Sequence, residues 1–257
     1  MDVGELSLWQ LGLLAVAGLM AGAVNAVAGG GSMISFPMLV VMGVPPVTAN
    51  VTNSVAALPG YIGGTLGYRA ELAGQGRRLV RLAAVSVPGA VTGALTLLAV
   101  SAEMFRAVVP WLVLASAALL AVQPQAAAWA ARRGGDSSPV GLLPAQFVMA
   151  FYGGFFVAGL GIVMLALLGV FLTETTHRLN ALKGVLSLVV GSVSAIAFIA
   201  LTSVAWGPAG LLAVTGLVGG RLGVLAARRI SPAALRRTVA SWGAGVAIAL
   251  EVSRHVA

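Results

Sequence analysis

Two glycine-rich motifs are the first places in this chain where residue types and spacing suggest chemistry. They read Val27-Ala28-Gly29-Gly30-Gly31-Ser32 and Val157-Ala158-Gly159-Leu160-Gly161, and each interrupts a long apolar stretch. A break in an apolar helix leaves backbone N–H and C=O groups unpaired, so it survives only where it is buried in protein or lines a cavity. The helix after a break directs a partial positive charge toward it, which favours an anion. These breaks therefore predict an anion site.

Other glycines have a simpler interpretation, because small residues let helices approach closely. For seven other glycines of the long apolar stretches, we predict helix packing and not ligand binding. They are Gly22, Gly89, Gly93, Gly216, Gly219, Gly220 and Gly223.

A polar cluster follows each break. The first cluster runs from Thr48 to Ser54, and the second contains Asn180 and Lys183, which is the only lysine of the chain. A cation inside a membrane usually faces a cavity or a partner, although a lysine can also extend to the nearby surface. Asn25 and Asn50 either bind a ligand or join helices, and Ser32 either caps the next helix or contacts a ligand. The predicted substrate-binding residues are Asn25, Gly29, Gly30, Gly31, Ser32, Asn50, Thr52, Asn53, Ser54, Gly159, Gly161, Asn180 and Lys183.

The sequence contains no recognisable catalytic or metal-binding constellation. It has no cysteine, only two histidines (His177 and His255), and no HExxH, GxSxG or Walker motif. We therefore predict a protein that is not an enzyme, with no cofactor, no catalytic residue and no metal site.

Composition identifies the solvent of this protein as lipid. Hydrophobic residues make up 59% and charged residues 9% of the 257 positions, and the mean hydropathy is +1.01. Soluble domains carry about a quarter charged residues. The net charge of +8 is assigned to membrane orientation by the positive-inside rule and not to nucleic-acid binding. The fold class is therefore an all-α integral membrane protein.

Apolar stretches predict about ten transmembrane helices. Two short stretches, Ser32–Val44 and Ile162–Thr173, are either re-entrant or short crossings. Only if both cross do the three arginine-rich loops, at 69–81, 132–133 and 228–237, share one side. We therefore predict ten crossings of the cytoplasmic membrane of a bacterium. The three arginine-rich loops lie on the cytoplasmic side and both termini lie on the outer side. The eight longer stretches are Leu8–Ala28, Thr48–Gly67, Leu79–Val100, Val108–Val122, Leu142–Ala158, Arg178–Ser203, Pro208–Ala227 and Leu235–Val252.

An internal repeat divides the chain into residues 1–131 and 132–257. An offset of 130 residues aligns Gly29 with Gly159 and Asn50 with Asn180, and it also aligns Asn53 with Lys183. Five crossings per half is an odd number, so the second repeat must have inverted topology. Inverted repeats with broken or short helices are typical of secondary transporters, whose substrates bind near the midplane where the repeats meet.

Several motifs of the two halves form a recognisable set. They are Asn25-Ala26-Val27-Ala28-Gly29-Gly30-Gly31-Ser32, Pro37, Gly43-Val44-Pro45-Pro46, Ala49-Asn50-Val51-Thr52-Asn53-Ser54, Gly67-Tyr68-Arg69, Gly153-Gly154-Phe155-Phe156-Val157-Ala158-Gly159-Leu160-Gly161 and Asn180-Ala181-Leu182-Lys183. These motifs resemble those of the TauE/SafE family of sulfite and organosulfonate exporters. The resemblance covers the chain from about Gly18 to Arg237 and implies transport of a small anion such as sulfite, sulfoacetate or another sulfonate. This chain has neutral Asn53 and Ser54 where many members carry a charged residue, which leaves Lys183 as the main candidate cation.

The expected partners are a small anionic substrate, the lipid bilayer, and a proton or sodium ion as coupling ion. The leading hypothesis is a secondary transporter that acts as an exporter. An anion channel is one alternative, and a non-transport membrane enzyme or assembly subunit is another. The sequence leaves open the exact substrate, the direction of transport and the oligomeric state.

Overall fold

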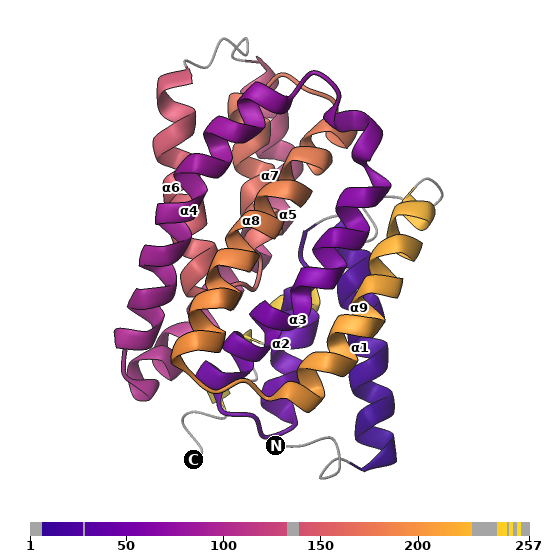
Figure 1. The fold of residues 1–257 in the computed structure, drawn as a ribbon, viewed down its shortest axis with the longest axis vertical. Coiled ribbons are helices and arrows are strands. Elements are labelled where there is room, and N and C mark those ends of the chain that lie inside the picture. Colours follow the sequence, from indigo (N-terminus) through magenta and orange to yellow (C-terminus); the bar gives the residue numbers. More distant parts are fainter. Residues whose placement is uncertain are drawn as a thin grey trace.

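The computed structural model describes residues 7–27, 29–132, 139–227, 241–245, 247–248 and 251–252, and within these ranges the regular elements are all helices. Figure 1 shows them as a bundle of roughly aligned helices. In chain order they are α1 (Leu8–Val27), α2 (Ser32–Val41), α3 (Pro46–Gly67), the 3-10 helix η2 (Arg69–Leu72), α4 (Gly76–Ala99), α5 (Ala102–Arg132), α6 (Pro139–Phe155), α7 (Leu160–Phe171), α8 (Thr176–Leu201) and α9 (Trp206–Ala227).

Helix lengths agree with an all-α membrane protein. Among the described residues, five helices are long and apolar enough to cross a bilayer: α1, α4, α5, α8 and α9. Helix α3 has 22 residues but carries the polar cluster. The 10 residues of α2 and the 12 of α7 span only about 15 and 18 Å, less than the ~30 Å hydrocarbon core. The predicted span Leu235–Val252 lies partly outside the described residues, and those described from 241 onward are helical.

Glycines set the closest helix contacts. A Cβ at Gly223 on α9 would lie 2.6 Å from the Cα of Ala23 on α1. A Cβ at Gly89 on α4 would lie 2.7 Å from the carbonyl oxygen of Phe147 on α6. The predicted packing role is thus confirmed at these positions. Gly216 differs, because its nearest such neighbour is 3.8 Å away.

Gly89 and Gly93 on α4 correspond to Gly219 and Gly223 on α9 at the offset of 130 residues. The α4 pair packs on α6 and the α9 pair packs on α1, so each pair contacts the first helix of the other half.

Helix directions agree with an inverted arrangement. Gly60 and Gly67 on α3 face Gly216 and Val224 on α9 in the same order, so these two helices are parallel. Gly184 and Gly191 on α8 face Thr65 and then Leu58, so α3 and α8 are antiparallel. Figure 1 shows α3 and α9 rising together while α8 descends. Because α3 and α8 are equivalent helices, their opposite directions support inverted repeats, whose boundaries at 131 and 132 stay a prediction.

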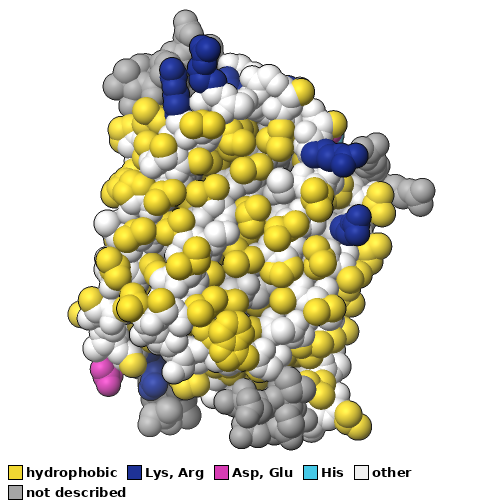
Figure 2. Space-filling model, viewed as in Figure 1, with side chains coloured by type: hydrophobic (Ala, Val, Ile, Leu, Met, Phe, Trp, Pro, Cys, Tyr) yellow, Lys and Arg dark blue, Asp and Glu magenta, His cyan; other side chains and the backbone are white. Residues whose placement is uncertain are grey.

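The three helices that precede the arginine-rich segments end on the same side of the bundle. The ends of α3, α5 and α9 lie at the top of Figure 1, opposite the start of α1. Figure 2 shows hydrophobic side chains over the middle of this face and most of its blue basic side chains toward the upper end. This distribution is what the positive-inside rule expects of a membrane protein. Residues 133 and 228–237 lie outside the described part, and the cytoplasmic assignment stays a prediction.

Candidate functional site

The two glycine-rich breaks meet inside the bundle. Gly29 and Gly159 have φ of +82° and +85°, in the left-handed region that glycine adopts without steric cost. A Cβ at Gly161 would lie 2.6 Å from the Cα of Gly29. The first break separates α1 from α2 as predicted, whereas the second spans 156–159 and places Gly161 inside α7. The breaks therefore contact each other directly, with no space between Gly29 and Gly161.

The end of α1 is held by side chains. The backbone N–H of Gly31 donates to Asn25 Oδ1 at 2.9 Å, so this N–H group is already paired. The backbone carbonyl of Asn25 accepts from Lys183 Nζ, also at 2.9 Å. Asn25 therefore closes the break with its amide and joins the two halves with its carbonyl.

Ser32 is the first residue of α2 and does not cap it. Gly31 occupies the capping position, and no side chain makes a capping hydrogen bond there. The Ser32 hydroxyl is buried without a hydrogen-bond partner among the described residues; the Tyr61 side chain lies beside it, but not in hydrogen-bond geometry. The capping alternative for Ser32 is thus wrong, and the ligand alternative stays a prediction.

The end of α6 is held in an equivalent way. Asn50 Nδ2 on α3 donates to the carbonyl oxygen of Phe155 at 3.0 Å, and Phe155 lies 130 positions after Asn25. In the other direction Lys183 on α8 reaches Asn25, and its Nζ also donates to Asn180 Oδ1 at 2.9 Å. Each broken helix therefore ends on a polar side chain from the other half.

Two more predicted residues have structural partners. Thr52 Oγ1 accepts from the backbone N–H of Ala205 at 3.0 Å, just before α9 begins. The Ser54 hydroxyl donates to the carbonyl of Asn50 in its own helix at 2.8 Å. Both side chains are buried, and their bonds secure helices instead of facing open space.

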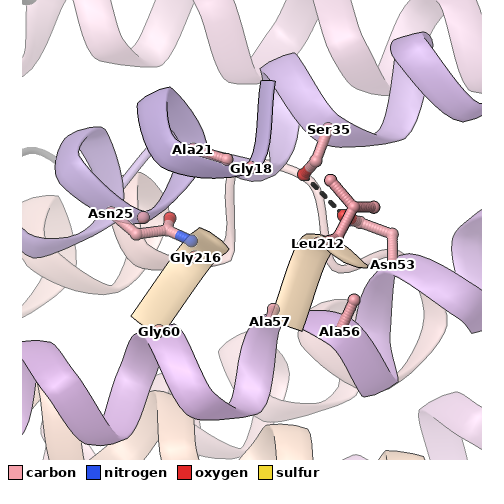
Figure 3. A pocket seen from close by; sticks show the side chains of 11 residues that line it. Gly18, Ala21, Asn25, Ser35, Asn53, Ala56, Ala57, Gly60, Leu212 and Gly216 are labelled. Atoms are coloured by element: carbon pink, nitrogen blue, oxygen red, sulfur yellow. Dashed lines mark hydrogen bonds between the residues drawn. The ribbon is translucent and has the colours of Figure 1, made fainter. Parts of the chain in front are cut away.

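A small cavity lies between α1, α2, α3 and α9, and Figure 3 shows it from close by. Its volume of about 20 Å³ is room for about one water molecule. Small residues form most of its walls, so the backbone of three helices borders the space. The lining residues are Gly18, Ala21, Gly22, Asn25, Ser35, Asn53, Ala56, Ala57, Gly60, Leu212 and Gly216.

Polar atoms gather on one side of this cavity. Ser35 donates its hydroxyl proton to Asn53 Oδ1 at 2.6 Å, the dashed line in Figure 3. Asn53 Nδ2 is buried and has no hydrogen-bond partner among the described residues. Since an unpaired buried donor costs free energy, this amide nitrogen is available to a ligand.

Sequence reasoning located part of this site. Of the predicted residues, Asn25 and Asn53 line the cavity, while the glycines of the breaks, Asn180 and Lys183 do not. Ser35 was missed, although it lies three residues after Ser32 and hence on the same face of α2. The wall formed by Gly18 and Gly60 was also missed, because nothing local distinguishes these glycines from packing glycines.

The polar side chains that line the cavity are neutral. Its lining residues carry no charge, and no group of three or more His, Cys, Asp or Glu side chains occurs in the described part of the chain. Amide and hydroxyl donors suit the oxygen atoms of a small anion.

An ionic cluster links the halves at the basic end. Arg78 contacts Glu174 at 2.8 Å, and Arg178 contacts the same carboxylate at 2.6 Å. The hydrogen bond from Arg78, and secondarily the Arg178 interactions, lower the pKa of Glu174 against the opposing effect of burial. Arg178 also donates to the carbonyl of Ala73 at 3.2 Å. The α3–α4 connection is thereby fixed to the start of α8.

These features define a multi-pass α-helical membrane protein with two broken helices that meet in its centre. The chain belongs to the family described as sulfite exporter TauE/SafE, whose family model matches residues 14–250. The family and the names of similar proteins indicate a membrane transporter.

Three relatives illustrate the similarity. A probable membrane transporter protein ORF9 of Sinorhizobium sp is 32% identical over 120 residues, covering 47% of this chain and 46% of that protein. A probable membrane transporter protein of Haemophilus influenzae is 29% identical, covering 64% and 63%. The probable membrane transporter protein YfcA of Escherichia coli K12 is 27% identical, covering 83% and 79%. The first two matches thus span less than two thirds of the relatives' lengths. No solved structure matches the chain.

Proposed function

We propose that this protein is a secondary transporter that exports a small sulfur-containing or organic anion, such as sulfite, sulfoacetate or another sulfonate, across the cytoplasmic membrane of a bacterium. The observation that carries the proposal is the buried cavity beside Asn25, Ser35 and Asn53. It contains an unpaired amide donor and no carboxylate.

The donors suit an anion that must also be released. Amide N–H groups bind sulfite or sulfonate oxygens more weakly than a guanidinium would, because only one of the two partners is charged. Lys183 adds one positive charge close by, because its ammonium binds the backbone of Asn25, which lines the cavity. Among the described residues no carboxylate forms a salt bridge with Lys183.

The cavity size favours a carrier over a channel. At about 20 Å³ it is too small for a polyatomic anion, so α1, α3 and α9 must separate before substrate enters. Rocking of one repeat against the other is the motion by which inverted-repeat carriers expose a central site to each side in turn.

Ligand stabilisation tests this proposal on purified protein. An anion at 100 times its Kd should stabilise the folded state by about 2.7 kcal/mol. Sulfite, thiosulfate, sulfonates and small carboxylates are compared by thermal unfolding, followed by flux into liposomes. Asn53→Asp should abolish the effect, because it replaces the donor with a negative charge.

Ser194→Ala is the matched control. It removes a buried hydroxyl that bonds only the carbonyl of Val190 in its own helix, and should leave ligand stabilisation unchanged. If no anion stabilises the protein, or if Asn53→Asp responds as the parent does, the cavity is not the anion site.

A further inference from the structure

Lys183 places its side-chain nitrogen at the end of a broken helix. Its Nζ lies 2.9 Å from the backbone oxygen of Asn25 and 2.9 Å from Asn180 Oδ1, and the residue is only 4% exposed. Both acceptors are neutral carbonyl oxygens. The ammonium is therefore held by carbonyl dipoles, as a metal cation would be.

The position of Lys183 Nζ at the end of α1 strengthens the comparison with a metal cation. Asn25 lies in the last turn of α1, which ends at Val27, and the carbonyls of a last turn carry partial negative charge. In transporters with broken helices, such helix ends and unwound carbonyls coordinate sodium ions. The Asn25 carbonyl oxygen at the end of α1 and Asn180 Oδ1, a side-chain oxygen near the start of α8, together form part of such a cation site.

The other half shows that the same link needs no charge. At the equivalent end of α6, the neutral amide of Asn50 donates to Phe155 at 3.0 Å. Because an amide suffices to join the halves there, joining alone does not account for a buried lysine, whose charge is costly inside a membrane.

We propose that the Lys183 ammonium is a tethered substitute for a coupling sodium ion at the end of α1. Anion transport then requires this charge and does not require sodium. The flux part rests on the proposed transport function, whereas occupation of the cation position is independent of it.

The experiment compares sodium chloride with choline chloride at equal ionic strength and fixed pH. Wild-type protein should show the same Tm and the same anion flux in both salts. Lys183→Met keeps the length of the side chain without its charge, and its flux should fall at least tenfold in both. Lys183→Ala frees the two oxygens, and sodium should raise its Tm and partly restore its flux.

Asn50→Ala is the control, since it removes the equivalent neutral link and should show no sodium-specific Tm change. Sodium-dependent wild-type flux, parental flux in Lys183→Met, or a folded Lys183→Ala indifferent to sodium would each overturn the proposal. If wild-type protein moves no anion, the transport function fails, while the Tm of Lys183→Ala still decides the cation position. If Lys183→Ala does not fold, Lys183→Met and the wild-type salt comparison decide.

Discussion

The cavity of the first half and the equivalent region of the second half differ in what fills them. Ser35, Ala56 and Gly60 border the cavity, whereas the positions 130 residues later are Leu165, Leu186 and Val190. These three are buried in one hydrophobic cluster.

This difference separates the fold from the site. Both halves keep the left-handed glycine at the break and the polar link at the end of the preceding helix. Only the first half keeps small and polar residues around a space. The two halves therefore share the contacts that hold the broken helices, but they differ in the side chains that follow these contacts.

Exchanging residues between the two regions should have the largest effect. Ala56→Leu fills the cavity, and anion flux per folded molecule should fall by about 100-fold, which is ~2.7 kcal/mol at 1.36 kcal/mol per decade. The reciprocal Leu186→Ala should destabilise the protein by about 2–5 kcal/mol but leave flux per folded molecule near the parental value. Liposome flux and thermal unfolding measure the two effects. Parental flux in Ala56→Leu would place transport elsewhere.

A smaller change sharpens the same comparison. A Cβ at Gly60 would lie 3.4 Å from the carbonyl oxygen of Gly216, an ordinary contact, so Gly60→Ala should fold. Because it narrows the cavity, we expect flux to fall roughly tenfold, or ~1.4 kcal/mol. Gly64→Ala is the control on the same helix, with its Cβ 3.6 Å from Ala26 and outside the cavity lining. Equal flux in both variants would contradict a role for the Gly60 wall.

The smallest expected effect is on the free energy of unfolding. It concerns the contacts that join the two halves at either end of the bundle. One end has the neutral bond from Ala205 to Thr52, and the other has the Glu174 cluster. The lowered pKa of Glu174 means that its contribution is present above the unfolded pKa of about 4.3 and is lost as pH falls through the lower folded value. Glu174→Gln should remove that part of the pH dependence, less than about 1 kcal/mol because the pair is partly exposed. Thermal unfolding between neutral and acidic pH measures it, and an unchanged pH profile would contradict it.

The sequence was sufficient to predict the helices and the two glycine-rich breaks. Apolar stretches and glycine runs are local signals, and they predicted α2 from Ser32 onward and the interruption before it. The opposed directions of α3 and α8 followed from counting crossings and locating arginines.

The location of the cavity was not predictable in the same way. Asn25 fills the first break by binding Gly31, and Gly29 packs on Gly161, so the expected opening between the breaks is closed. The actual space depends on how α9 packs against α1 and α3, which is a long-range property. Asn50 and Lys183 could be recognised as important polar residues, but their partners lie on distant helices.

The bond between Lys183 and Asn25 joins residues 158 positions apart, with a consequence for biosynthesis. The amino-terminal half is made first, and the end of α1 waits for a partner that is not yet translated. An unpaired carbonyl in hydrocarbon costs several kcal/mol. A product that stops after α5 would therefore reach the membrane as an incomplete assembly, exposed to the proteases that remove unfinished membrane proteins.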